Sequence, residues 1–273
     1  MKRVAILDHA ILIAGCLFMV LPVLTIFLTS THDNLSIARN GLQFSWGGHF
    51  LDVYGGVLTG TTGFFRSITA AGMLANSLIL ALGMAIGKCT LALLSAYALV
   101  YFRFRYSSLA FWLIFTSLLL PIETRIVPTF LVVSDLGMLN SYTGLILPLL
   151  PAAIGTLFFR QFFKSVPEEL AEAARLDGAG PFRFLVDILI PISRPVIVAL
   201  FVITFVEGWN QYLWPLMVST TDEGYFTIVR GIGRIGGASN SGMALSILAM
   251  LPPVALVIVL QRWLVRGLTD GFH

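Results

Sequence analysis

The sequence predicts an all-α polytopic membrane protein with six transmembrane helices in a single domain of 273 residues. Hydrophobic residues make up 57% of the chain and the mean hydropathy is +0.90. Charged residues make up 11%, whereas a typical soluble domain has about 25%. A helix needs about 20 apolar residues to cross a hydrocarbon core about 30 Å thick. Six stretches meet this requirement, at about residues 8–29, 73–100, 108–133, 142–163, 194–218 and 243–264.

The first apolar stretch follows Lys2 and Arg3, which is also the pattern of a cleavable signal peptide. The stretch is long and no small-residue cleavage site follows it cleanly, so we expect a retained helix. Cys16 and Cys89 both lie inside apolar stretches, which excludes a disulfide framework and a paired-cysteine metal site.

The distribution of basic residues predicts that both termini lie in the cytoplasm. With that orientation the inner segments hold Lys2, Arg3, Arg103, Arg105, Arg160, Lys164, Arg175, Arg183, Arg194, Arg262 and Arg266. The outer segments then hold only Arg39, Arg66, Arg230 and Arg234, in agreement with the positive-inside rule. The net charge of +3 therefore reflects membrane topology rather than nucleic-acid binding.

The connections between the apolar stretches differ in length. An outer loop from Ser30 to about Gly72 is rich in Gly, Ser, Thr and aromatic residues and shows no strong period, so we expect an ordered or partly ordered loop without a catalytic domain. A tight inner turn at residues 101–107 and an outer turn at residues 134–141, with Gly and Asn as turn residues, predict antiparallel neighbouring helices.

The one long inner loop, residues 164–194, contains the polar sequence EELAEAARLDGAG. Ser165 and Glu168 have the spacing of a capping box, and Pro167 suits the first turn of a helix. Glu168 and Glu169 favour the positive end of the helix dipole. We therefore predict that a short helix starts here.

The same loop contains the signals for a second helix. Gly178 suits the C-cap of the first helix, and Pro181 can open a second one, PFRFLVDILI, that ends at Pro191. On the first helix the i, i+3, i+4 and i+7 spacing predicts a face of mostly small residues, formed by Leu170, Ala173, Ala174 and Asp177.

Several familiar motifs lack the context that their chemistry needs. The glycine-rich RGIGRIGG at residues 230–237 lies in a predicted outer loop, and residues 251–260 offer no acidic side chain at the distance that a dinucleotide site requires. GMAIGKC at residues 83–89 has the wrong spacing for a P-loop. The second loop helix is too apolar to recognise DNA, and the four histidines are too scattered for a metal site or a catalytic triad. We therefore predict no catalytic residue, cofactor or metal in this chain.

The inner loop resembles the EAA loop, EAA-x3-G-x9-I-x-L-P, of permease subunits in binding-protein-dependent ABC importers. The matching residues are Glu172, Ala173, Ala174, Gly178, Ile188, Ile190 and Pro191, with Ile190 replacing the usual Leu. The resemblance extends over nearly the whole chain, through SAYAL at residues 95–99, LGMLNSYTGLILP at 136–148, GWNQYLWPL at 208–216 and QRWLVRGLTDG at 261–271. These runs resemble the carbohydrate class, which includes the smaller subunit of the maltose permease. FWLIFTSLLLPIETRIVPTF at residues 111–130 and FVITF with GWNQYLWPL at residues 201–216 are most similar to the sn-glycerol-3-phosphate permeases of the Ugp type.

This resemblance implies an assembly in a bacterial inner membrane. The expected partners are a homologous sister permease, two copies of a cytoplasmic ATPase that bind ATP and Mg²⁺, an extracytoplasmic solute-binding protein and membrane lipid. The EAA loop is expected to dock into the ATPase and to couple ATP hydrolysis to transport. The expected coupling residues are Glu168, Glu169, Glu172, Ala173, Ala174, Asp177, Gly178 and Pro191. Alternatively, the loop is an ordinary capped turn between two spans.

Charged side chains inside the predicted spans indicate a cavity or a partner, because each costs about 2.5–3.5 kcal/mol at the centre of a membrane helix. Four residues qualify: Lys88, Glu123, Arg125 and Glu207. Glu123 and Arg125 lie between two prolines, where broken backbone can line a water-filled path. Arg125 can offer a bidentate fork to a phosphate. Alternatively, both lie near the outer end of their helix and neutralise charges of the sister subunit.

Amides and aromatic rings gather on the fifth predicted span, at Trp209, Asn210, Gln211, Tyr212 and Trp214. Such groups suit the hydroxyls of a polyol or the face of a sugar. Alternatively, Trp and Tyr form an interfacial belt while Asn210 and Gln211 bond to neighbouring helices. Residues 219–242 occupy the place of the maltose-type loop that enters the binding protein, although they also suit a simple connector.

The expected function is the import of sn-glycerol-3-phosphate or a glycerophosphodiester, with this chain as a non-catalytic permease subunit. The same role for a sugar, oligosaccharide or polyol is the alternative. A secondary transporter is a third possibility, but it would usually contain an internal repeat with broken helices, which the sequence does not show.

Overall fold

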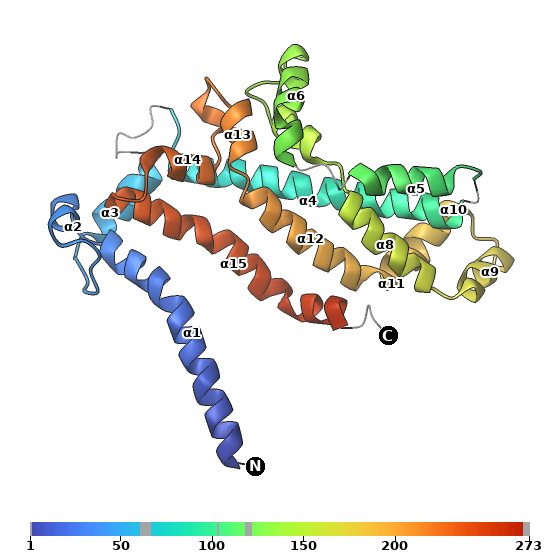
Figure 1. Cartoon of the computed structure of the whole chain (residues 1–273), viewed down its shortest axis with the longest axis horizontal. Coiled ribbons are helices and arrows are strands. Elements are labelled where there is room, and N and C mark those ends of the chain that lie inside the picture. The colour runs from blue at the N-terminus through green and yellow to red at the C-terminus, as the bar shows by residue number, and fades with distance from the viewer. Residues whose placement is uncertain (1, 61–66, 103, 118–121, 270–273) are drawn as a thin grey trace. The chain divides into compact units, whose positions relative to one another are not determined.

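A computed structural model describes residues 2–60, 67–102, 104–117 and 122–269, without the side chains of residues 2–7, 122–123 and 264–269. Every regular element in these ranges is helical, which confirms the all-α prediction (Figure 1). The α-helices are α1 (Lys2–Ser30), α2 (Asn34–Asn40), α3 (Phe50–Thr59), α4 (Ala70–Tyr101), α5 (Ser107–Thr116), α6 (Ile122–Asp135), α7 (Tyr142–Ile146), α8 (Ala153–Ser165), α9 (Glu168–Leu176), α10 (Pro181–Phe184), α11 (Ile190–Ile192), α12 (Arg194–Trp209), α13 (Leu213–Val218), α14 (Ile228–Ile235) and α15 (Asn240–Thr269). The 3₁₀ segments are η2 (Leu147–Leu149) and η4 (Glu223–Tyr225), and η3 (Leu185–Leu189) is a π-helix.

Three described helices are long and apolar enough to cross a membrane alone, at Asp8–Ser30, Ala70–Tyr101 and Asn240–Trp263. Two bent pairs bring the number to five if each counts as one span: Tyr142–Leu149 with Ala153–Ser165, bent by 49°, and Pro181–Ile192 with Arg194–Trp209, bent by 76°. These helices make the chain a multi-pass membrane protein by length and composition. The number of six spans stays a prediction.

Proline positions explain two interruptions of the predicted spans. The span at residues 142–163 bends beside Pro151, which has no backbone donor for a continuous helix. The span at residues 194–218 stops at Trp209, and α13 starts at Leu213 with Pro215 in its first turn, where a missing N–H is tolerated. In the span at 108–133, residues 118–121 between α5 and α6 are outside the described ranges.

Contacts divide the chain into two compact units, which are described separately. Unit 1 comprises Met1–Asn76 and Phe226–Leu251, and unit 2 comprises Ser77–Tyr225 and Pro252–His273.

Unit 1 orders the predicted outer loop by aromatic packing and capping. Phe27 near the end of α1 contacts the rings of Trp46, Phe50 and Tyr54 at centroid distances of 6.1–6.3 Å. Asp33 caps α2 by accepting a hydrogen bond from the backbone N–H of Ser36 at 3.2 Å. The loop therefore contains two short helices, α2 and α3, which its composition did not indicate.

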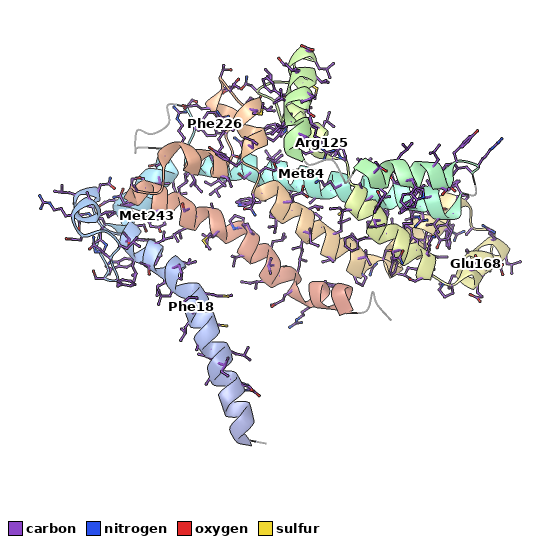
Figure 2. All side chains as sticks on the ribbon, in the orientation of Figure 1. Phe18, Met84, Arg125, Glu168, Phe226 and Met243 are labelled. Atoms are coloured by element: carbon purple, nitrogen blue, oxygen red, sulfur yellow. The ribbon has the colours of Figure 1, made fainter. Side chains whose placement is uncertain are left out.

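Helix α1 exposes most of its apolar surface. Ile11, Leu12, Leu17, Phe18 and Met19 are 61–80% exposed, and Figure 2 labels Phe18 along the helix. A surface this apolar is typical of a helix that contacts lipid or another membrane helix.

Unit 2 packs α4 closely against the segment that follows α6. Gly83 and Gly87 of α4 leave room for Ile146 and Leu150, because a Cβ at either glycine would lie within 2.7 Å of those side chains. Gly83 and Gly87, the glycines of the P-loop-like sequence, therefore allow close helix packing. The predicted turn at residues 134–141 is confirmed, since Gly137 and Asn140 both adopt positive φ, +67° and +51°.

Candidate functional site

The loop between α8 and α12 contains the short helix α9, whose beginning is labelled by Glu168 in Figure 2. Gly178 follows α9 with φ +74°, the left-handed conformation that favours glycine. The N–H of Ala179 donates to the carbonyl of Ala174 at 2.8 Å, and that of Gly178 donates to Arg175 at 3.0 Å. These bonds satisfy the last carbonyls of the helix. Asp177 occupies the C-cap position, and the predicted glycine that ends the helix is Gly178, one residue later.

The predicted capping box at the start of α9 is wrong. Ser165 is the last residue of α8, and its hydroxyl donates to the carbonyl of Phe162 at 2.7 Å. Pro167 occupies the N-cap position and makes no side-chain cap. Helix α8 ends at Ser165 and α9 begins at Glu168, so Ser165 lies too far before α9 to be its N-cap residue. The start of the helix at Glu168 and the two glutamates in its first turn agree with the prediction.

The predicted small-residue face of α9 is divided between the interior and the surface. Ala174 is 4% exposed and belongs to the core around Phe163 and Phe184. The side chains on the other sides of the helix and at its C-cap are exposed, namely Glu168, Glu169, Leu170, Glu172, Ala173 and Asp177. Leu176 and Phe182 are 89% and 78% exposed. The loop therefore presents carboxylates together with two large exposed apolar side chains.

The second loop helix runs from Pro181 to Ile192, one residue beyond the predicted end at Pro191. Its middle, Leu185–Leu189, is a π-helix, in which the hydrogen-bond register shifts by one residue. Pro191 lies at the start of α11 directly after this shift. The bend of 76° follows at Ser193, whose hydroxyl donates to the carbonyl of Leu189.

A direct hydrogen bond joins this loop to the long helix α4. The hydroxyl of Tyr97 donates to the carbonyl of Pro181 at 2.8 Å. Tyr97 is buried, and its ring contacts Tyr101 and Phe102 at 5.4 and 5.3 Å. The loop is therefore attached to the last turns of α4.

A cavity of about 460 Å³ with both polar and apolar lining residues lies in unit 2 between the broken segments of the predicted spans. It is lined by Lys88 of α4, by Arg125, Ile126 and Thr129 of α6, by Pro148, Leu149 and Pro151 at the first bend, and by Glu207, Gln211, Tyr212, Leu213 and Trp214 around the second break. Both helix interruptions thus contribute to one cavity, as expected where irregular backbone occurs at membrane depth.

Lys88 and Glu207 form an ion pair at the wall of the cavity. The Nζ atom of Lys88 donates to Oε1 of Glu207 at 2.7 Å, and the two side chains are 11% and 42% exposed. The residues are 119 positions apart, so the sequence contained only an indirect signal, two opposite charges in apolar spans. Arg125 is exposed at the same cavity and is labelled in Figure 2.

The aromatic and amide residues of the fifth predicted span separate in the structure. Gln211 and Tyr212 line the cavity. Trp209 is 2% exposed and stacks on Phe205 at 5.9 Å, which gives it a packing role. Asn210 is exposed and is not a lining residue.

Trp214 also lines the cavity. Its Nε1–H lies 3.2 Å from the carbonyl oxygens of both Gly144 and Leu145, which fixes α13 to α7. Of the predicted path residues, the cavity therefore brings together Arg125, Glu207, Gln211 and Tyr212. The side chain of Glu123 lies outside the described residues.

Comparisons with known proteins identify the family. The family model described as "Binding-protein-dependent transport system inner membrane component" matches residues 88–270. Three relatives are named sn-glycerol-3-phosphate transport system permease protein UgpE. The one from Yersinia enterocolitica is 45% identical over 96% of this chain and 95% of its own length. Those from Brucella melitensis and Pectobacterium atrosepticum are 42% and 45% identical over 97% of this chain and 96% of their own lengths.

A solved structure has the same fold. A chain in the crystal structure of a bacterial ABC transporter involved in the import of the acidic polysaccharide alginate superposes with a TM-score of 0.78. The match covers 96% of this chain and 97% of that chain, at 20% sequence identity. The architecture is therefore that of an ABC importer permease.

Proposed function

The chain belongs to the family of binding-protein-dependent transport system inner membrane components, and from this membership we propose that it is the permease subunit of an ATP-driven importer for sn-glycerol-3-phosphate. The names of its relatives support this solute. The observation that carries the proposal within this chain is the cavity, because it combines Lys88 and Arg125 with the hydrogen-bonding side chains of Gln211 and Tyr212. Cations suit a phosphate, and the polar side chains suit glycerol hydroxyls.

The loop at residues 164–194 is the proposed coupling element. Its exposed carboxylates at Glu168, Glu169, Glu172 and Asp177 would contact basic residues of a cytoplasmic ATPase, with Ala173 allowing a close approach. Ala174 would not contact the ATPase, because it is buried in the core and holds α9 against the rest of unit 2. Gly178 and Pro191 would set the directions of the two loop helices.

The proposed assembly contains this chain, a sister permease and two ATPase copies, and it receives solute from an extracytoplasmic binding protein. ATP and Mg²⁺ would be bound by the ATPase copies, and this chain would contribute no catalytic residue. Both termini would lie in the cytoplasm, and residues 219–242 would contact the binding protein.

Reversing the charge of Glu172 tests the coupling role. Glu172→Arg should reduce ATP-driven uptake and the amount of ATPase that copurifies with the chain, because the exposed carboxylate lies at the proposed contact. Asp52→Arg makes the same change on the exposed side of α3 and serves as the control. Normal uptake and normal assembly of Glu172→Arg would show that the coupling role is wrong.

The solute is tested with the complete complex in proteoliposomes. ATP-driven uptake of sn-glycerol-3-phosphate, unaffected by collapse of the proton gradient, is the expected result. Uptake of a sugar or polyol in its place would favour the alternative solute, for which the ring and hydroxyl of Tyr212 and the amide of Gln211 are the supporting groups. Uptake driven by a proton gradient without ATP would indicate a secondary transporter.

A further inference from the structure

The two members of the ion pair in the cavity differ in their access to solvent. The side chain of Lys88 is 11% exposed, whereas that of Glu207 is 42% exposed. A buried ammonium needs an anionic or hydrogen-bonding partner, because desolvation without one is costly. The carboxylate of Glu207 can leave the pair and remain hydrated in the cavity. The charge of Lys88 therefore depends on Glu207, whereas the charge of Glu207 does not depend on Lys88.

We propose that Glu207 is a displaceable internal anion, which holds Lys88 until the phosphate of the solute takes its place. The inference rests on the proposed function and assigns specific roles within it. Lys88 becomes a specificity-determining residue for a phosphomonoester, and Glu207 becomes a competitor that limits how tightly the phosphate binds.

The position of Glu207 suits this exchange. It lies in the last turn of α12, just before the chain leaves helical conformation between Trp209 and Leu213. Its neighbours Gly208 and Trp209 are buried, but the side chain of Glu207 is 42% exposed and can turn without moving the helix. Lys88 instead lies within the uninterrupted helix α4, and its side chain is 11% exposed, so its ammonium has little access to water.

Arg125 supplies the second positive charge on the cavity. An ammonium donates up to three hydrogen bonds and a guanidinium donates two in parallel, so the two can share the oxygens of one phosphate. When the carboxylate of Glu207 turns away, Lys88 and Arg125 both face the doubly charged phosphate of the solute. When the solute leaves, the carboxylate restores the partner of Lys88, so the exchange also assists release.

Equilibrium binding to the complete complex in nanodiscs, without the binding protein, tests the exchange. Radiolabelled sn-glycerol-3-phosphate is the probe, and glycerol is the neutral comparison. Glu207→Gln should bind the probe about tenfold more tightly, equivalent to about 1.4 kcal/mol, and should transport it more slowly because release is impaired. Lys88→Met should lose binding. Glycerol binding should not differ among these proteins.

The double variant Lys88→Met with Glu207→Gln separates the exchange from a structural role. It removes both members of the ion pair, so neither is left without its partner. A purely structural pair therefore predicts that binding recovers, whereas the exchange predicts that it stays lost. Asp135→Asn removes a carboxylate outside the cavity and is the matched control, with unchanged binding. If Glu207→Gln does not assemble, Glu207→Asp weakens the contact with Lys88 and should give a smaller increase in affinity.

Unchanged or weaker binding by Glu207→Gln or Glu207→Asp would overturn the exchange. Uptake by the unmodified complex is measured in parallel with its binding protein and ATP. Suppose the unmodified complex takes up sn-glycerol-3-phosphate normally but the Glu207 variants do not bind it more tightly; this result refutes only the exchange. If the complex takes up only a neutral solute, both the proposed solute and the exchange are refuted.

Discussion

Replacing Gly178 by alanine should loosen the end of α9 without any steric clash. A Cβ at this position would meet no atom within 4 Å, so the only penalty comes from the positive φ of +74°. A residue with a Cβ in that conformation costs about 1–2 kcal/mol. Gly178→Ala should therefore raise the local opening of the helix end about 5- to 30-fold.

Hydrogen exchange measures this opening at a defined amide. The N–H of Ala179 donates to the carbonyl of Ala174 at 2.8 Å, so its exchange reports on the cap directly. Gly180→Ala is the matched control, because Gly180 has φ −70° and equally open surroundings. Its exchange should stay at the level of the unmodified chain, and its uptake should remain normal. Equal exchange in the two variants would refute the argument from backbone conformation.

Three further changes probe the packing of unit 2, with the thermal unfolding midpoint of the purified complex as the common measurement. Ala174→Leu should destabilise it by about 1–3 kcal/mol through overpacking of the core around Phe163 and Phe184. Tyr97→Phe should lower the free energy of unfolding by about 0.5–1.5 kcal/mol and reduce uptake, because the hydrogen bond from α4 to the carbonyl of Pro181 is lost. Tyr106→Phe removes the hydroxyl of an exposed ring and should change neither stability nor uptake. Gly208→Ala should lower the midpoint, because its Cβ would lie 2.9 Å from a backbone atom of α4 that has no freedom to move. An unchanged midpoint in all three first-named variants would contradict the packing described for this unit.

Features that depend on neighbouring residues could be predicted from the sequence. The start of α9 at Glu168 and the cap at Gly178 follow from local backbone preferences, and both are present. The capping box failed because its two residues belong to different helices, and spacing alone does not show where the first helix ends. The inward position of Ala174 depends on Phe163 and Phe184, whose places in the fold the sequence does not specify.

The cavity illustrates the same limit at longer range. Each charged residue could be recognised by itself as unusual in an apolar stretch, as Lys88, Arg125 and Glu207 were. Their common location depends on two helix interruptions, near Pro151 and Pro215, that the hydropathy pattern does not reveal. Trp209 was predicted for the path because of its residue type, but its neighbour Phe205 places it in the packing.

Helix α4 carries both the contact to the loop and the contact to the cavity. Tyr97 follows Lys88 by nine residues without a proline or a break between them, which corresponds to about 13 Å along the axis. A helix is stiff along its axis, so the backbone at Lys88 and at Tyr97 moves together. If the proposed ATPase displaces the loop, the backbone of α4 at Lys88 should move together with Tyr97. No intermediate with a displaced loop and an undisplaced backbone at Lys88 should then accumulate during a transport cycle.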